Sequence, residues 1–405
     1  MQLGDAQGNH FQILVRDVKP LTQDVKPLTQ ESMDQDSKHV LLDRLETVKK
    51  IGFINYFGMQ RFGSRAISTH VIGKHLLLQE WKEACMLILG RDEPLNQSHV
   101  FHQQSRKENQ LDFHDARDFF FTTFDAKKAL EKYPRFCVAE KSILSCLLRQ
   151  GAAALQKHHQ EEENEATIKT SYLECIQSIT RNLRQMYLHA YQSKIWNEMV
   201  SKRHAKYGAT IVIGDFVIPP AAQGVVDMDQ EDDADSEGDK IHLPRGLDNT
   251  IEITSQDQAK MYTIHNLVLP LPGHQVKYPS NMVEEYKSIM ALDNLDPLDM
   301  TRKVKETSLD GRYRYVYANV SDLQWSFLAY DHATDSTTNF IKSDLDNLEK
   351  KQNVPVETAS DDVVEKKGVA LLLEFSLKSS QYATMVMREL FHQETSSSFQ
   401  SQFSK

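Results

Sequence analysis

Apolar and polar residues alternate near the start of the chain. Phe11, Ile13 and Val15 recur at every second position, and alternate residues of a β-strand share one face of it. A strand is therefore predicted over residues 9–18. Further strands are predicted over residues 209–220, 311–320, 323–331 and 369–377.

Apolar residues recur every three to four positions through most of the middle of the chain. Leu41, Leu45 and Val48 share one side of segment 37–52, and Gly52 follows as a predicted stop. A single helix is predicted over residues 73–90, because one apolar stripe runs through the whole segment. Further helices are predicted over residues 126–132, 140–155, 182–208 and 379–393.

These predictions place sheet-forming segments near both ends of the chain and a helix-rich block between them. That order indicates an α+β fold in which one domain is inserted into a loop of another. The unit DVKPLTQ occurs twice in succession over residues 17–30. Each copy contains a Pro that opposes helix formation, so we expect a surface loop lengthened by duplication.

The net charge of −10 argues at first against a nucleic-acid partner. Two short blocks account for it, since Asp227–Asp239 carries eight acids and Glu161–Glu165 carries four. Without those twelve acids the rest of the chain has a charge of +2, because −10 + 12 = +2. Acidic blocks of this kind are usually solvated insertions, so a basic surface elsewhere is compatible with the composition.

The composition also limits the kinds of site and compartment. The four cysteines, Cys85, Cys137, Cys146 and Cys175, form no CxxC pair and no zinc-ligand spacing, so neither a metal site nor a disulfide framework is predicted. No apolar run reaches the roughly 18 residues of a membrane span, and the first residues do not read as a secretory signal. Cytosol or nucleus is the predicted compartment.

Several longer stretches have a more specific pattern. They are GNHF (Gly8–Phe11), NYFGMQRFG (Asn55–Gly63), MYLHAYQSKIWN (Met186–Asn197), VLPLPG (Val268–Gly273), GRYR (Gly311–Arg314) and YATMVMRE (Tyr382–Glu389). In these stretches and in their order the chain resembles the TruD-type pseudouridine synthases, and most of all their eukaryotic branch.

The resemblance implies a more detailed architecture. Residues 1–62 and 301–405 would form the pseudouridine synthase catalytic domain, an antiparallel or mixed sheet with flanking helices whose N-terminal part is missing. Residues 63–300 would form an inserted, helix-rich TRUD domain with a disordered acidic loop at 226–240.

The resemblance also implies an activity, the isomerisation of uridine to pseudouridine in tRNA, mRNA or both. Family members use one Asp as nucleophile and need no metal or organic cofactor. The expected partner is RNA, with no membrane involved, and the expected compartment is the nucleus, with cytoplasm or mitochondrion as alternatives. The target uridine must leave its stack, and an aromatic wall can offset part of that cost.

The GNxF motif implies the first group of site residues, Gly8, Asn9 and Phe11. Phe11 would stack on the flipped base, and Asn9 would orient the nucleophilic carboxylate. Alternation alone instead predicts that Phe11 packs in a core with Ile13 and Val15. A turn-forming role is the plainer interpretation of Asn9.

The second group of predicted site residues is Gln60, Arg61 and Arg314. Gln60 and Arg61 would face the RNA, while the aromatic residues around them anchor a turn. Arg314 would contact a phosphate, and a solvated place on the strand surface is the alternative for both Arg312 and Arg314.

The nucleophile of the family lies in a Gly-x-Lys-Asp type motif before GNxF. The chain contains no such motif, and Asp5, the only acid before Asn9, lies in LGDAQG, which does not match. No catalytic residue is therefore assigned, and the chain is expected to be inactive alone. The alternatives are a non-catalytic RNA-binding module and a helical interaction protein whose aromatic residues are only core.

Overall fold

The structure, a computed structural model, describes residues 8–16, 35–63, 65, 67–91, 107–151, 164–220, 249–331, 341 and 367–392. The chain forms two compact units. Unit 1 holds the described residues up to Tyr56 and from Tyr315 onward, and unit 2 holds those from Phe57 to Arg314. The segments at 17–30 and 226–240 lie outside the described residues. The assignment of catalytic and inserted domains with limits at 62 and 300 stays a prediction.

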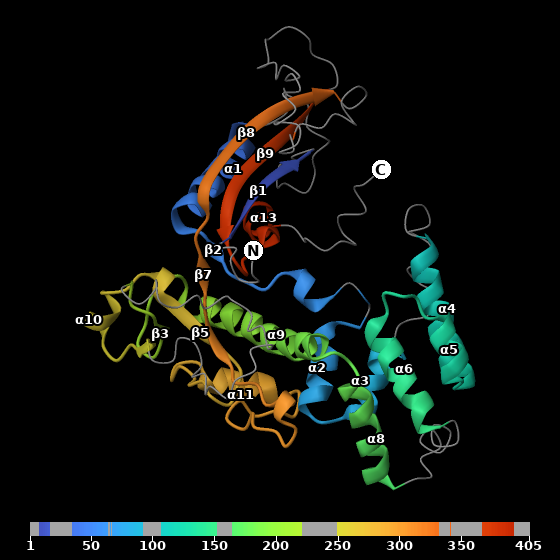
Figure 1. Cartoon of the computed structure of the whole chain (residues 1–405). Helices are drawn as coiled ribbons and strands as arrows, with labels where there is room; N and C mark the ends of the chain where they lie inside the picture. Colours follow the sequence, from blue (N-terminus) through green and yellow to red (C-terminus); the bar gives the residue numbers. More distant parts are fainter. Residues whose placement is uncertain are drawn as a thin grey trace. The chain divides into compact units, whose positions relative to one another are not determined.

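Unit 1 is built on a three-stranded antiparallel sheet (Figure 1). Its strands are β1 (Gly8–Val15), β9 (Lys367–Lys378) and β8 (Ser321–Asp331), in the order β1-β9-β8. Phe11 lies directly opposite Phe375 in the register of β1 and β9. The three strands predicted from alternation and apolar runs in these places are confirmed.

One face of this sheet carries the core of unit 1. Two helices, α1 (Gln35–Ile51) and α13 (Ala383–Phe391), pack against alternate residues of β9. The core side chains come from all of these elements and include Leu45, Val48, Leu371, Leu373, Phe375, Val386 and Leu390. Because side chains of a strand alternate, the residues between them, such as Leu372 and Glu374, point to the opposite face.

A two-strand ribbon closes unit 1, with β2 (Phe53–Ile54) paired to β7 (Tyr317–Ala318). Gly52 precedes it with φ of +82°, a conformation that favours glycine. A Cβ there would lie 2.0 Å from the Ala318 carbonyl oxygen, so only glycine fits. Asn55 follows, and its side-chain amide donates to the Tyr315 carbonyl at 3.1 Å.

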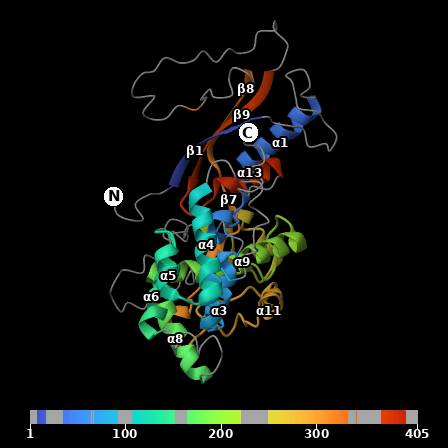
Figure 2. The same cartoon turned by 90° about the vertical axis from the view of Figure 1, so that its right-hand side faces the viewer.

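Unit 2 is mostly helical, and its longest helix, α9 (Arg181–Tyr207), is the long green helix of Figure 1. The other helices are α2 (Thr69–Leu77), α3 (Trp81–Ile88), α4 (Lys107–Thr123), α5 (Ala126–Lys132), α6 (Val138–Gln150), α8 (Glu165–Gln177), α10 (Gln256–Ala259) and α11 (Val283–Ala291), with the short turns η1 (Met59–Phe62), η3 (Ile264–Asn266) and η4 (Lys305–Thr307). Figure 2 shows α4, α5 and α6 from a second side. The helix α9 packs closely on α2, where a Cβ on Gly73 would lie 2.0 Å from the Tyr187 carbonyl oxygen.

The single helix predicted over residues 73–90 is wrong, because the chain forms α2 and α3 instead. Gln79 takes a left-handed φ of +59°, which interrupts the helical hydrogen bonds. The amide of Glu80 then bonds to the His75 carbonyl at 2.9 Å, and α3 begins at Trp81. The apolar stripe is continuous in sequence because both short helices bury the same kind of face.

Unit 2 also contains a small sheet with the order β4-β3-β5-β6. Its strands are β4 (Ile251–Glu252), β3 (Phe216–Val217), β5 (Leu267–Leu271) and β6 (Arg312–Tyr315), whose last residue belongs to unit 1. The strand predicted over residues 209–220 is therefore confined to two residues. The strand predicted over 311–320 is interrupted at Val316, so that β6 and β7 join different sheets.

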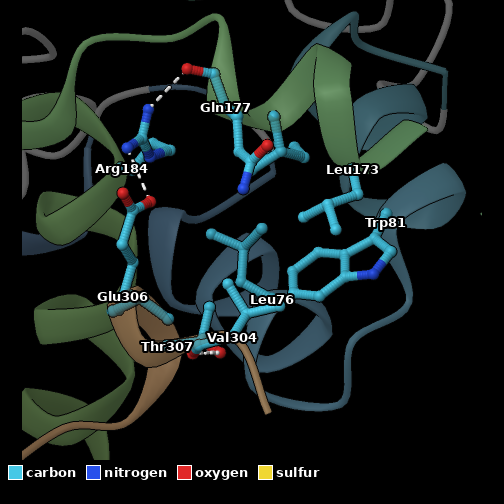
Figure 3. A pocket seen from close by; sticks show the side chains of 10 residues that line it. Leu76, Trp81, Leu173, Gln177, Arg184, Val304, Glu306 and Thr307 are labelled. Atoms are coloured by element: carbon cyan, nitrogen blue, oxygen red, sulfur yellow. Dashed lines mark hydrogen bonds and ion pairs between the residues drawn. The ribbon is translucent and has the colours of Figure 1, made fainter. Parts of the chain in front are cut away.

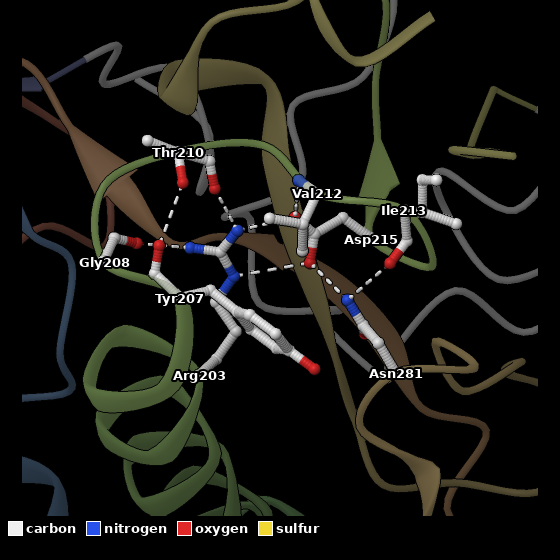
Figure 4. A network of polar contacts seen from close by, with 8 residues as sticks. All are labelled: Arg203, Tyr207, Gly208, Thr210, Val212, Ile213, Asp215 and Asn281. Atoms are coloured by element: carbon white, nitrogen blue, oxygen red, sulfur yellow. Dashed lines mark hydrogen bonds and ion pairs between the residues drawn. The ribbon is translucent and has the colours of Figure 1, made fainter. Parts of the chain in front are cut away.

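A buried ion pair explains why residues 208–215 form a loop rather than a strand (Figure 4). The Arg203 guanidinium pairs with the Asp215 carboxylate at 2.5 Å, and both side chains are fully buried. Arg203 also donates to the carbonyls of Gly208 and Thr210. Asp215 accepts from the Val212 amide at 2.9 Å and from the Asn281 side chain at 3.0 Å. The loop is thus folded around the end of α9.

Replacing Asp215 with Asn should lower the free energy of unfolding by about 3–5 kcal/mol, because the charge of Arg203 would stay buried without its partner. Denaturant unfolding of the purified chain measures the difference. The control is Asp257→Asn, which breaks the exposed pair of Asp257 with Lys260 and should cost no more than about 1 kcal/mol. Equal losses in the two variants would contradict the interpretation.

Candidate functional site

The candidate site begins with a contact between two motif stretches of unit 2. The Asn197 side chain of α9 accepts a hydrogen bond from the Phe57 amide at 2.9 Å and donates one to the Phe57 carbonyl at 3.0 Å. A side-chain amide has a donor and an acceptor with the spacing of a peptide group, so it satisfies both groups of Phe57 at once. This pairing joins NYFGMQRFG to HAYQSKIWN across 140 residues of sequence.

The Phe57 ring organises the arginines around it. Trp196 meets it edge to face with ring centroids 5.6 Å apart. The guanidinium of Arg314 lies 4.1 Å from the Phe57 centroid and 5.4 Å from that of Trp196, and that of Arg61 lies 5.3 Å from Phe57. Both arginines are within the roughly 6 Å at which a cation is attracted by an aromatic ring.

The strand β5 and the residue that follows it, Pro272, are fixed to α9 by hydrogen bonds to their carbonyl groups. The indole of Trp196 donates to the Leu269 carbonyl at 3.1 Å, and the Gln192 amide donates to the Pro272 carbonyl at 2.7 Å. Gly273 then meets Gly311, where a Cβ on Gly273 would lie 2.2 Å from the Gly311 amide nitrogen. The VLPLPG and GRYR motifs need their glycines for this close approach.

A histidine next to the arginines is held neutral. The pKa of His189 on α9 is lowered to about 3, mainly by burial and in addition by the charges of Arg312 and Arg61. An uncharged imidazole adds no positive charge to the cluster and can accept a hydrogen bond. The cluster therefore combines buried aromatic rings with two guanidinium groups and a neutral imidazole.

The predicted residues of the second group lie close to this cluster. Arg61 and Arg314 both contact the Phe57 ring, while Gln60 is exposed on the neighbouring turn η1. The solvated alternative for Arg314 is wrong, because its side chain is 2% exposed. Whether these residues bind RNA stays a prediction.

The predicted residues of the first group lie on β1 in unit 1. Gly8 and Asn9 are exposed, and a Cβ on Gly8 would lie 2.3 Å from the Leu377 carbonyl oxygen. Phe11 is half-buried and stacks on Phe375 with centroids 5.6 Å apart. It packs with Ile13 against the core of unit 1, as alternation predicts. Its stacking on a flipped base stays a prediction.

A small enclosed space in unit 2 has a structural role (Figure 3). It measures about 10 Å³, roughly the space of one water molecule, and Leu76, Trp81 and Leu188 are among its lining residues. At its edge Arg184 donates to the Gln177 carbonyl at 2.8 Å and pairs with Glu306 at 2.6 Å. The cavity is too small for a nucleotide.

The described residues also hold neither a metal site nor a membrane-spanning helix. No group of three His, Cys, Asp or Glu side chains there could hold a metal ion. No helix of the described ranges is long and apolar enough to cross a membrane. All four cysteines are buried and unpaired.

Sequence reasoning missed Asn197, Phe57 and Trp196 as parts of the site. Trp196 lies on the helix predicted over residues 182–208, and it is fully buried. The signal for Asn197 was present in its motif, but its partner lies 140 residues away and no local period connects the two.

Comparison with known proteins agrees with the motif stretches. The family model described as tRNA pseudouridine synthase D (TruD) matches residues 1–390. The chain is 34% identical over 399 residues to Multisubstrate pseudouridine synthase 7 of Schizosaccharomyces pombe, covering 98% of this chain and 50% of that protein. It is 31% identical over 403 residues to human Pseudouridylate synthase 7 homolog, covering 99% and 48%. The chain thus spans about half the length of these relatives.

A solved structure supports the same fold. It is the putative tRNA pseudouridine synthase D (TruD) of Methanosarcina mazei, with a TM-score of 0.58 and 20% sequence identity. The match covers 96% of this chain and 70% of that one. The α+β fold with antiparallel sheets is that of a pseudouridine synthase. The chain belongs to the TruD family.

Replacing Asn197 with Ala should lower the free energy of unfolding by about 1–3 kcal/mol, because the buried amide and carbonyl of Phe57 lose their partner. Denaturant unfolding measures it. Asn182→Ala is the matched control, since Asn182 is an exposed residue of the same helix and should change stability by less than about 0.5 kcal/mol. A neutral Asn197→Ala would show that the pairing does not hold the site together.

Proposed function

We propose that this chain supplies the RNA-binding and base-holding parts of a pseudouridine synthase that isomerises uridine in RNA. The observation that carries the proposal is the meeting of four motif stretches around Phe57 in unit 2. NYFGMQRFG and HAYQSKIWN pair through Asn197, VLPLPG is bound by Gln192, and GRYR contributes Arg314. Membership of the TruD family supports the same proposal.

The reaction sets requirements for these residues. The bond from the sugar C1′ to the base N1 breaks, the base turns, and a bond from C1′ to C5 forms while C5 loses its proton and N1 gains one. In the proposal, Phe11 stacks on the base, Asn9 orients the nucleophilic carboxylate, and Gly8 allows the close approach of β1 to the Leu377 carbonyl. Gln60 and Arg61 face the RNA.

Arg314 has a supporting place in this proposal. A guanidinium that is 2% exposed and stacked on Phe57 holds the aromatic cluster and contributes positive potential. Its charge still favours a phosphate nearby, since a buried charge is screened less by salt than an exposed one.

The source of the nucleophile is the second element of the proposal. The 405 residues contain no Gly-x-Lys-Asp type motif, so we propose that the chain alone does not turn over. A non-catalytic RNA-binding role is the second candidate function, favoured by that same observation. The choice between tRNA and mRNA as substrate, and residence in the nucleus, are proposals that rest on the family alone.

Tritium release from RNA labelled at uridine C5 tests the proposal, because C5 loses its hydrogen when the new bond forms. The 405-residue chain should release no tritium, whereas a version preceded by a segment with the family's Gly-x-Lys-Asp type motif should release it. Release by the chain alone would overturn the proposed source of the nucleophile. An inert extended protein that still binds RNA would leave only the non-catalytic role.

In the extended protein, Phe11→Ala should weaken catalysis by about 1–3 kcal/mol with little loss of RNA affinity, because one stacking contact is lost. Tritium release and a binding titration are measured together. Ile13→Ala is the matched control, since Ile13 is half-buried on the same face of β1 and should lower stability without slowing turnover. Unchanged turnover in Phe11→Ala would show that Phe11 does not stack on the base.

A further inference from the structure

We propose that the outer face of α6 in unit 2 is an additional RNA-binding surface, one that takes a single-stranded RNA segment. The surface, called here the α6 groove, is an open groove of about 670 Å³ that includes Arg135, Lys141, Ser142, Ser145 and Arg149. It deepens the proposed function and rests on it, because RNA is the substrate in both. No residue of the groove belongs to the motif stretches or to the site around Phe57.

The α6 groove is positively charged. Arg135, Lys141 and Arg149 line the groove, and no Asp or Glu lines it. None of the three makes an ion pair or a side-chain hydrogen bond with another described residue, whereas Lys206, Lys260 and Lys287 of the same unit all pair with a carboxylate. Three uncompensated cations in one groove of a chain with net charge −10 mark a place for a polyanion.

The basic residues of the groove are spaced along α6. Lys141 and Arg149 lie eight residues apart on one helix, which is about 12 Å along its axis at 1.5 Å per residue. A stacked strand rises about 3.4 Å per nucleotide, so this distance covers three to four nucleotides. The cations are therefore spread along a strand rather than gathered on one phosphate.

Apolar side chains are exposed near the basic residues of the groove. Phe136, which follows Arg135 in the sequence but does not line the groove, is 57% exposed, and Val138 and Leu148 of the groove are 49% and 41% exposed. An exposed aromatic ring next to a basic groove is the arrangement on which unpaired bases stack. A duplex keeps its bases stacked inside, so this surface favours a single strand.

The groove is held in shape by the helices below it. Ile143 and Leu144 on the opposite side of α6 are fully buried. At the end of α8, the Ser178 hydroxyl shares its one hydrogen between the Cys175 carbonyl at 2.7 Å and the Ser142 carbonyl at 3.1 Å. The Ser142 hydroxyl donates to the Val138 carbonyl at 2.9 Å, so its oxygen can still accept a hydrogen bond from a ribose 2′-hydroxyl.

The test is fluorescence anisotropy of a labelled, unstructured 20-nucleotide RNA with the 405-residue chain at several salt concentrations. The triple variant Arg135→Gln, Lys141→Gln, Arg149→Gln should reduce the slope of log K against log salt by about 2, since each lost phosphate contact on a single strand contributes about 0.7. Phe136→Ala should weaken binding by at least about fivefold at every salt concentration.

Two matched controls separate the groove from a general loss of charge. Lys206→Gln, Lys260→Gln, Lys287→Gln removes the same charge from paired lysines and should leave the slope unchanged. Arg135→Lys, Lys141→Arg, Arg149→Lys keeps the charge and should keep the slope. Thermal melting checks that each variant folds, as expected because every substituted position is exposed or half-buried.

The outcomes distinguish the groove from the proposed function. If the unsubstituted chain binds RNA and the two Gln variants have equal slopes, the proposal that the α6 groove binds RNA is overturned and the proposed function stands. If the unsubstituted chain binds no RNA at any salt concentration, the proposed function fails as well. If the groove variant loses binding of an acidic peptide, DMDQEDDADSEGD, but not of RNA, the occupant is an acidic polypeptide and the proposal is overturned.

Discussion

The two hydrogen bonds between the Asn197 side chain and the Phe57 peptide are the contact on which the site of unit 2 depends. They fix the backbone from which the Phe57 ring meets Trp196 and supports Arg314. A hydrogen bond weakens steeply with misalignment, so a small shift of α9 would loosen the ring and the cations together. The same helix holds β5 through Gln192, so one rigid element positions segments from three parts of the chain.

Much of unit 1 could be predicted from the sequence, because its strands show the two-residue period of a sheet with one buried face. The α+β fold and the strands β1, β8 and β9 follow from that period, and α1 follows from the stripe that ends before Gly52. The helix predicted over residues 73–90 failed for a local reason. The left-handed conformation of Gln79 breaks the helix without changing the apolar pattern, and no residue type there signals it.

The candidate site was harder to predict for a different reason. Motif stretches indicated Arg61 and Arg314, but periodicity describes only neighbours in sequence, and Asn197 meets Phe57 across 140 residues. Arg314 was open to two interpretations because a strand pattern gives the face of a side chain and not what covers that face. Its cover is Phe57, which comes from a segment with neither helical nor strand period. A residue's partner, more than its own type, decides its role here.

The arginines of unit 2 fall into two groups, buried ones that stabilise the fold and exposed ones that can bind a ligand. Arg203 is fully buried, and its donors are taken up by a carboxylate and two carbonyls, so it serves the fold. A fully buried guanidinium that uses four of its five N–H groups in this way is not available to a ligand. Arg135 and Arg149 are exposed beside an open groove without a carboxylate in it. Net charge averages over both kinds, and so the value of −10 says little about where an RNA strand would bind. The relevant field is local, since charges farther away than about 8–10 Å are largely screened at physiological salt.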